Sequence, residues 1–131
     1  MLFRSLLLQL RDDIPGILAP GKIGLFGGHC EDNETGLDCA VREIAEETSY
    51  AVPRQRFRLL TRYAGPDLDG TSGQLDAEIY IVRDIPVERL TITEGSLLSI
   101  SKNDIPRLKE KMTGLTYLCM QAYLNQRPIA E

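Results

Sequence analysis

The stretch Gly28-His-Cys-Glu-Asp-Asn-Glu-Thr-Gly-Leu-Asp-Cys-Ala-Val-Arg-Glu-Ile-Ala-Glu-Glu-Thr-Ser-Tyr50 decides how the chain is interpreted. Its second part has the periodicity of an amphipathic helix, from about Gly36 to Thr48. Thr35 can cap the start of this helix, with Asp38 as the acid of a capping box. The residues that share its apolar side are Leu37, Ala40, Val41, Ile44, Ala45 and Thr48. We therefore predict a helix that packs this side against a sheet.

Three acids, Glu43, Glu46 and Glu47, share a different face of the same helix, because they stand at positions i, i+3 and i+4. Like charges at this spacing oppose the helix by about 0.2–0.5 kcal/mol for each pair. Arg42 can offset part of this repulsion by reaching Glu46 at i+4. A hard divalent cation with oxygen ligands would offset the rest. The alternative is an ordinary solvated acidic face.

The whole stretch resembles the Nudix box. That pattern is Gly, five residues, Glu, seven residues, Arg-Glu, an aliphatic, any residue, Glu-Glu, any residue, Gly and an aliphatic. Gly28, Glu34, Arg42, Glu43 and the pair Glu46-Glu47 match it in register. Two positions depart from it: Ser49 replaces the glycine and Tyr50 replaces the aliphatic. Since glycine serves there to end the helix in a left-handed conformation, serine should cost on the order of 1 kcal/mol.

The resemblance implies a role for each matching residue. Glu43, Glu46 and Glu47 would hold Mg²⁺ or Mn²⁺, together with the backbone carbonyl of Gly27. One of the glutamates, or a metal-bound hydroxide, would activate the attacking water. Glu34 and Arg42 would brace the loop against the helix.

The implied function is hydrolysis of a phosphoanhydride bond in a small molecule, a nucleoside diphosphate linked to another moiety. Candidate substrates are nucleoside triphosphates, nucleotide sugars and dinucleotide cofactors. The rival reading, from a different class, is a Nudix-fold regulator that binds a nucleotide without cutting it. The complete set of acids favours the enzyme.

The other elements predict an α/β (α+β) fold of Nudix type, with a mixed β-sheet between helices. We treat residues 1–131 as one domain, because no repeat or linker interrupts the chain. The predicted strands are Phe3 to Leu10, Ile23 to Phe26, Arg56 to Tyr63, Glu78 to Val82 and Leu97 to Ser101. A turn is predicted over Gly65 to Gly73 and a last helix over Leu115 to Asn125.

Nudix domains usually have a strand before the one predicted at Phe3 to Leu10, and this chain has no residues for it. The sheet is therefore expected to lack an edge strand. A bare edge invites pairing with another chain, which favours a homodimer. The segment after Leu124 is the alternative cover for the gap.

Composition limits the function classes. The net charge of −4 argues against a nucleic-acid binder, which usually shows a basic face. The longest apolar run, Leu6 to Leu8, is too short to span a membrane. The three cysteines, Cys30, Cys39 and Cys119, form no CxxC pair, so we expect neither a disulfide framework nor a zinc site, and a reducing cytoplasm fits best.

Five further residues lie within the Nudix-box region or are expected near it in the fold. His29 could contact substrate or could be a loop histidine without a role. Glu94 could add one more acid or be an ordinary solvated glutamate. Arg11 could reach a substrate phosphate or lie on the surface. Cys39, like Cys30, is expected to be a packing residue.

Overall fold

The computed structural model describes residues 5–17, 19–69 and 72–126. One sheet has the order β2-β1-β5, with β1 (Leu6–Leu10) between β2 (Ile23–Gly24) and β5 (Ser96–Ile100). Both ladders of this sheet are antiparallel, and an isolated parallel bridge joins Ile23 to Met112. A second sheet is the antiparallel hairpin of β3 (Arg58–Pro66) and β4 (Gln74–Ile81).

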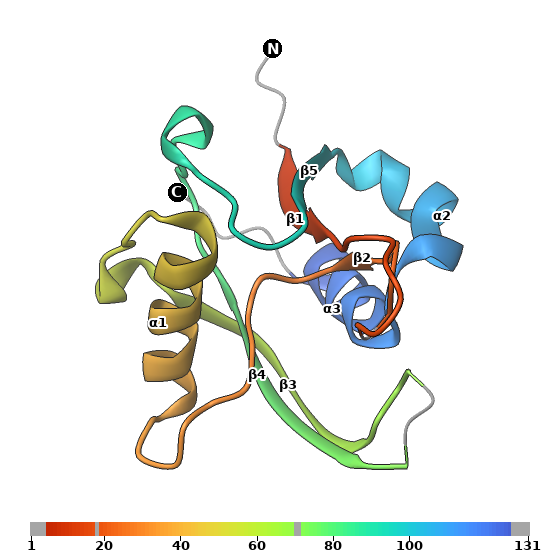
Figure 1. The fold of residues 1–131 in the computed structure, drawn as a ribbon, viewed down its shortest axis with the longest axis horizontal. Helices are drawn as coiled ribbons and strands as arrows, with labels where there is room; N and C mark the ends of the chain where they lie inside the picture. Colours follow the sequence, from red (N-terminus) through yellow and green to blue (C-terminus); the bar gives the residue numbers. More distant parts are fainter. Residues whose placement is uncertain (1–4, 18, 70–71, 127–131) are drawn as a thin grey trace.

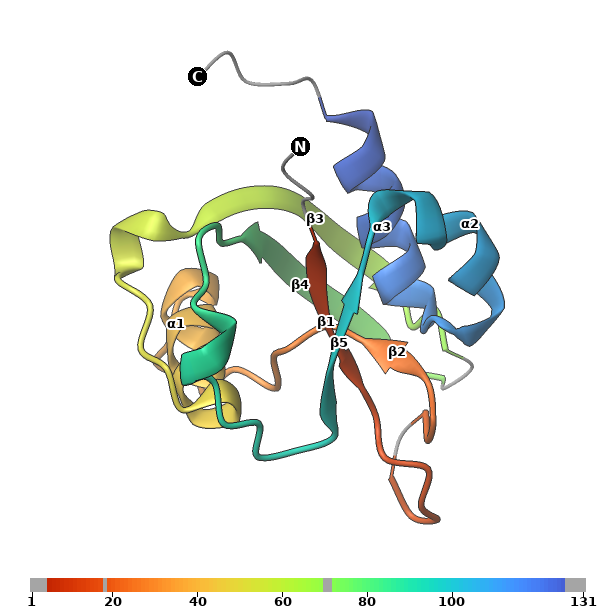
Figure 2. The same cartoon turned by 90° about the horizontal axis from the view of Figure 1, so that it is seen from above.

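In these described ranges, three helices accompany the sheets: α1 (Gly36–Thr48), α2 (Ile105–Leu108) and α3 (Gly114–Asn125). The long β3–β4 hairpin runs between α1 on one side and α3 on the other (Figure 1), and α1 contacts β4 whereas α3 contacts β3. Figure 2 shows the two C-terminal helices together beside β2, on the opposite side of the molecule from α1. Short 3₁₀ turns complete the chain; they are η1 (Arg54–Arg56), η2 (Val87–Arg89), η3 (Lys102–Asp104) and η4 (Lys109–Lys111).

The hydrophobic core lies between the β2-β1-β5 sheet and the C-terminal helices. Its buried residues are Leu8, Ile23, Ile100, Ile105, Leu108, Met112, Cys119 and Met120. Within α1, in contrast, the buried residues are Cys39, Glu47 and Thr48, and the predicted apolar side is only half-buried. Polar and covalent contacts therefore have a larger part in holding α1 than in holding α3.

The α+β class predicted from the sequence is confirmed. The predicted helix over residues 36–48 has the observed bounds of α1, and the last helix begins one residue earlier than predicted. The hairpin strands reach further into the predicted turn, because β3 continues to Pro66 and β4 begins at Gln74.

The strand predicted over Ile23 to Phe26 is wrong in its second half. Only Ile23 and Gly24 pair with β1, opposite Leu10 and Gln9. The chain then leaves the sheet and crosses towards α1, where the backbone of Gly27 bonds to that helix. A continued ladder would have kept this segment away from the helix.

β1 is the inner strand of its sheet, with β5 along its full length. On its other side β2 covers only Gln9 and Leu10, so among the described residues no ladder covers that side of Leu6 to Leu8. The half-open side is the feature on which the homodimer prediction rests, and the dimer stays a prediction. The predicted residues Phe3 and Arg4, and most of the segment after Leu124, lie outside the described residues. In the part of the chain that is described, no helix is long and apolar enough to cross a membrane.

Candidate active site

α1 begins and ends as its sequence predicts. Thr35 accepts a hydrogen bond from the backbone N–H of Asp38, and the Asp38 carboxylate accepts one from the N–H of Thr35, which completes a capping box. At the other end Ser49 is left-handed, with φ 58° and ψ 22°, and its N–H bonds to the carbonyl of Ala45. The helix end thus has the geometry for which the box normally provides glycine.

Arg42 joins the loop before α1 to the acids of the helix. Its guanidinium holds Glu34 through two hydrogen bonds of 2.6 and 2.7 Å. It also donates to Glu43 at 2.7 Å, to Glu46 at 3.2 Å and to the carbonyl of His29 at 3.2 Å. The hydrogen bond from Arg42 lowers the pKa of Glu34, so this carboxylate stays charged.

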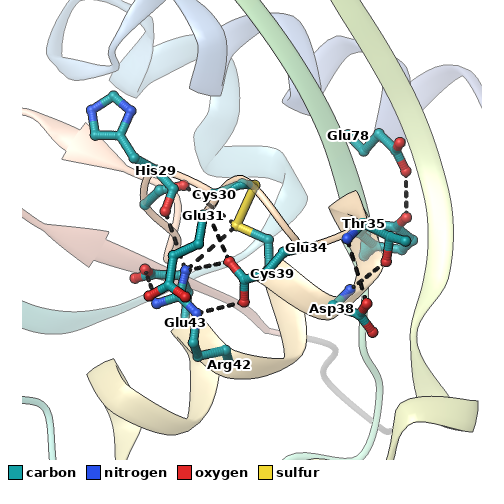
Figure 3. The surroundings of a disulfide bond; sticks show 12 residues. His29, Cys30, Glu31, Glu34, Thr35, Asp38, Cys39, Arg42, Glu43 and Glu78 are labelled. Atoms are coloured by element: carbon teal, nitrogen blue, oxygen red, sulfur yellow. Dashed lines mark hydrogen bonds and ion pairs between the residues drawn. A yellow bond between two sulfur atoms is a disulfide. The ribbon is translucent and has the colours of Figure 1, made fainter.

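Figure 3 shows this arrangement around the loop, with Arg42 between Glu34 and Glu43. The imidazole of His29 points away from Arg42, so His29 contributes its backbone to the network. The bracing of loop and helix that the resemblance implied for Glu34 and Arg42 therefore agrees with their contacts.

Glu47 is the buried acid of the site, with 7% of its surface exposed. Its Oε2 accepts a hydrogen bond of 2.8 Å from the backbone N–H of Gly27. The pKa of Glu47 is raised to about 7, mainly by burial; the charges of Glu43 and Glu94 also raise it, whereas the Gly27 hydrogen bond and Arg11 lower it. A carboxylate in this setting gains from a nearby cation.

The Glu43 carboxylate lies directly against the backbone of Gly28. A side-chain carbon at position 28 would lie 2.7 Å from Oε2 of Glu43, closer than van der Waals contact allows. The loop therefore passes directly over this acid. Glu46, in contrast, points outward, with 58% of its side chain exposed.

The segment before β5 is fixed to the end of α1 through backbone groups. The N–H groups of Thr91 and Thr93 donate to the carbonyls of Thr48 and Glu47, at 2.9 and 3.0 Å. This contact brings the next residue, Glu94, close enough to influence the Glu47 carboxylate. Glu94 is exposed to solvent and also lies near Glu47, so its role as a further acid of the site stays a prediction.

A hollow of about 260 Å³ opens beside this segment. Gln9, which is 3% exposed, contributes to its wall and donates its side-chain amide to the carbonyl of Glu94 at 3.0 Å. The residues that line the hollow are Gln9, Arg11, Asp12, Ile17, Glu94 and Gly95. Arg11 thus lies near Glu94 and Glu47, and its contact with a substrate phosphate stays a prediction. Gln9 was not predicted to lie near the site; a polar residue near the end of an apolar strand was the available signal.

The cysteines contradict the sequence analysis, because Cys30 and Cys39 form a disulfide with their Cα atoms 5.2 Å apart. The first turn of α1 presents Cys39 to the loop as it returns from Gly28, and this spatial closeness is not visible in the spacing of the two residues along the chain. The bond is drawn in Figure 3. The expectation of a reducing cytoplasm rested on the absence of a disulfide and loses that support. Cys119 is free and buried, and its burial raises the pKa of the thiol to about 12.

The three acids assigned to metal do not converge on one point. Across the described residues, no group of three acidic, histidine or cysteine side chains is arranged to hold a metal ion. Glu43 and Glu46 bond to Arg42, and Glu47 bonds to Gly27. A cation at this site would therefore need new rotamers of Glu43 and Glu46, away from the guanidinium.

The sequence pattern of the NUDIX domain matches residues 4–99, which are most of the chain. The chain belongs to the Nudix family. Solved structures share the fold of this Nudix domain at low sequence identity. The solution structure of the ORF135 protein of E. coli has a TM-score of 0.72 and 16% identity, over 96% of this chain and 86% of that one.

Two other Nudix structures are similar. The Nudix hydrolase RenU of M. smegmatis has a TM-score of 0.59 and 20% identity, over 92% of this chain and 73% of its own. The NUDIX domain of NrtR of Shewanella oneidensis, solved with ADP ribose, has a TM-score of 0.63 and 17% identity, over 92% and 78%. No curated protein sequence matches the chain. The family of this Nudix domain and its fold are thereby established.

Proposed function

We propose that this Nudix domain is a metal-dependent hydrolase, which cleaves a phosphoanhydride bond in a nucleoside diphosphate linked to another moiety. The single observation that carries the proposal is the buried carboxylate of Glu47, held by the Gly27 backbone with the charges of Glu43 and Glu94 beside it. Such a cluster is costly in a site without a cation, and it suits a substrate that arrives with one.

Mg²⁺ or Mn²⁺ fits the donor set, because the acids supply oxygen ligands and neither cysteine of the loop is a free thiolate. Glu43, Glu46 and Glu47 would hold the cation, with the carbonyl of Gly27. When bound, the metal would polarise the diphosphate and lower the pKa of a water ligand. The close passage of Gly28 over Glu43 keeps this wall of the site free of side chains.

The protein's own residues supply position and charge. Arg42 and Glu34 would hold the loop at a fixed distance from α1, so that the hydrogen bond between Gly27 and Glu47 is kept. Glu47, Glu46 or Glu43 would accept the proton of the attacking water. Arg11, in the wall of the hollow, would contact a phosphate of the substrate and orient it.

A second candidate function is a nucleotide-binding regulator without hydrolytic activity. The similarity in fold to the NUDIX domain of NrtR, which was solved with ADP ribose, favours this candidate. The complete acid set favours the enzyme, because binding alone does not require three carboxylates on one helix. In either case the ligand would be a small nucleotide derivative and not a nucleic acid.

The test is a nucleotide panel with and without Mg²⁺ or Mn²⁺, which includes nucleoside triphosphates, nucleotide sugars, dinucleotides and ADP-ribose. Metal-dependent release of phosphate, pyrophosphate or a nucleoside monophosphate from at least one compound supports the enzyme. Saturable binding of a compound that stays intact over many hours with metal present supports the regulator instead.

A further inference from the structure

A basic hollow of about 200 Å³ lies at the open end of the hairpin, where β3 begins and β4 ends. The residues that line it are Gln55, Arg56, Arg58, Ile81, Arg83 and Asp84. None of them belongs to the candidate active site. The segment from Tyr50 to Pro66 carries four arginines and no acid, in a chain whose net charge is −4.

The local fold assembles this hollow around Arg56. Its guanidinium donates to the backbone carbonyl of Arg83 and, at 2.7 Å, to that of Asp84. The backbone of Asp84 is left-handed, with φ 60°. Positive φ is uncommon for residues other than glycine. The turn after β4 thus closes around the guanidinium of Arg56. Since Arg58 stands opposite Ile81 in the ladder, this turn brings Arg83 to the same end of the hairpin as Arg58.

The arginines of this hollow have fewer acidic partners than the neighbouring arginines outside it. Arg54 forms an ion pair with Asp38, and Arg62 stands opposite Glu78 in the ladder. Within the described residues, the guanidinium groups of Arg58 and Arg83 form neither a hydrogen bond nor an ion pair. Arg56 bonds to carbonyls, which carry no full charge. Three guanidinium groups therefore face one carboxylate, that of Asp84.

We propose that this hollow binds a phosphate group of a small molecule, with inorganic phosphate and pyrophosphate as the simplest representatives. Guanidinium groups are suited to phosphate oxygens, because each can donate two parallel hydrogen bonds. Arg58 and Arg83 would contact the anion, and Arg56 would hold the turn that positions Arg83. A hollow of about 200 Å³ has room only for a small ligand. Since no acid of α1 takes part, binding here needs no divalent metal and is independent of the proposed hydrolysis.

The test is calorimetric titration with inorganic phosphate and with pyrophosphate, in EDTA, so that metal-dependent binding is absent. Arg58→Gln/Arg83→Gln is the test variant. Lys102→Gln/Arg107→Gln removes the same charge from exposed positions elsewhere and is the control. We expect one saturable site in the wild type and the control, and at least about tenfold weaker binding in the test variant. Glu47→Gln is expected to bind as the wild type does.

Several results would overturn the proposal. They are the absence of saturable binding to the wild type, equal weakening in the control variant, and a clear change of affinity in Glu47→Gln, which would place the anion at the active site. NMR of the wild type gives a test that requires no variant to fold. Pyrophosphate should shift the Nε–H signals of Arg58 and Arg83 but not that of Arg107, and signals of Arg58 and Arg83 that stay fixed at high pyrophosphate would contradict the assignment.

Discussion

The backbone N–H of Gly27 donates a 2.8 Å hydrogen bond to Oε2 of Glu47, and this bond links the segment that leaves β2 to the last turn of α1. It fixes a buried carboxylate beneath a loop that also passes directly over Glu43. The helix and loop are therefore placed as one unit, although α1 contributes little to the main hydrophobic core. The predictions below concern the parts of this unit.

The first prediction concerns pH and stability without divalent metal. The pKa of Glu47 is about 7 in the folded protein and near 4.5 in the unfolded chain, so the folded state binds more protons in that window. The free energy of unfolding should therefore fall as the pH rises from about 4.5 to 7, by about 2–3 kcal/mol, and stay at the lower value above 7. Urea unfolding in EDTA at several pH values measures this.

The direction of the effect and one variant separate Glu47 from the other acids. The lowered pKa values of Glu34, Asp38 and Asp104 act in the opposite direction and below the usual pKa of these groups. Glu47→Gln should remove the decline between pH 4.5 and 7. Equal slopes for the wild type and Glu47→Gln in that window would contradict the assignment.

The second prediction concerns the end of α1. Ser49→Gly should be neutral or stabilise the protein by up to about 1 kcal/mol, because glycine adopts the observed left-handed conformation without strain. Ser49→Ala is the matched control and should not stabilise, since alanine keeps the side-chain carbon. Melting temperatures decide the matter; a clear decrease for the glycine variant would show that Ser49 makes a contact that offsets its strain.

The third prediction concerns Arg42. Arg42→Lys should lower the midpoint of chemical denaturation, because lysine cannot hold Glu34 through two parallel bonds and reach Glu43 as well. Arg107→Lys is the control, since the Arg107–Asp104 pair is more exposed and its loss should change the midpoint much less. Chemical denaturation measures both changes. Similar effects at the two positions would mean that the Arg42 network is no stronger than a surface ion pair.

The fourth prediction concerns the disulfide between Cys30 and Cys39. Reduction by dithiothreitol should destabilise the oxidised protein by about 2–3 kcal/mol, because the bond closes a short loop in the unfolded chain. Dithiothreitol should not affect the Cys30→Ser/Cys39→Ser variant. Thiol titration of the denatured protein gives a direct check: one thiol is expected without reductant, and three thiols in protein purified without reductant would refute the bond.

Local signals were sufficient for α1 and its caps, because Thr35, Asp38 and the spacing of the acids act within one helix. Ser101 and Asp104 also have the spacing of a capping box, and they form one before α2, although no helix start was predicted there. The rest depends on tertiary contacts. The approach of Glu94 to Glu47 follows from backbone bonds of Thr91 and Thr93, and backbone groups are the same in every sequence. Likewise the disulfide depends on how the loop after Gly28 returns to α1.

The most direct test of the account compares the wild type with Glu47→Gln in metal-dependent hydrolysis of whichever nucleotide the panel identifies. The substitution keeps the size and the hydrogen-bond acceptor for Gly27 but removes the ligand charge. We predict that Glu47→Gln melts at or above the wild-type temperature and loses most of the activity, roughly a hundredfold or more, at limiting Mg²⁺. A folded Glu47→Gln protein with wild-type turnover under the same conditions would contradict the central claim that Glu47 holds the metal.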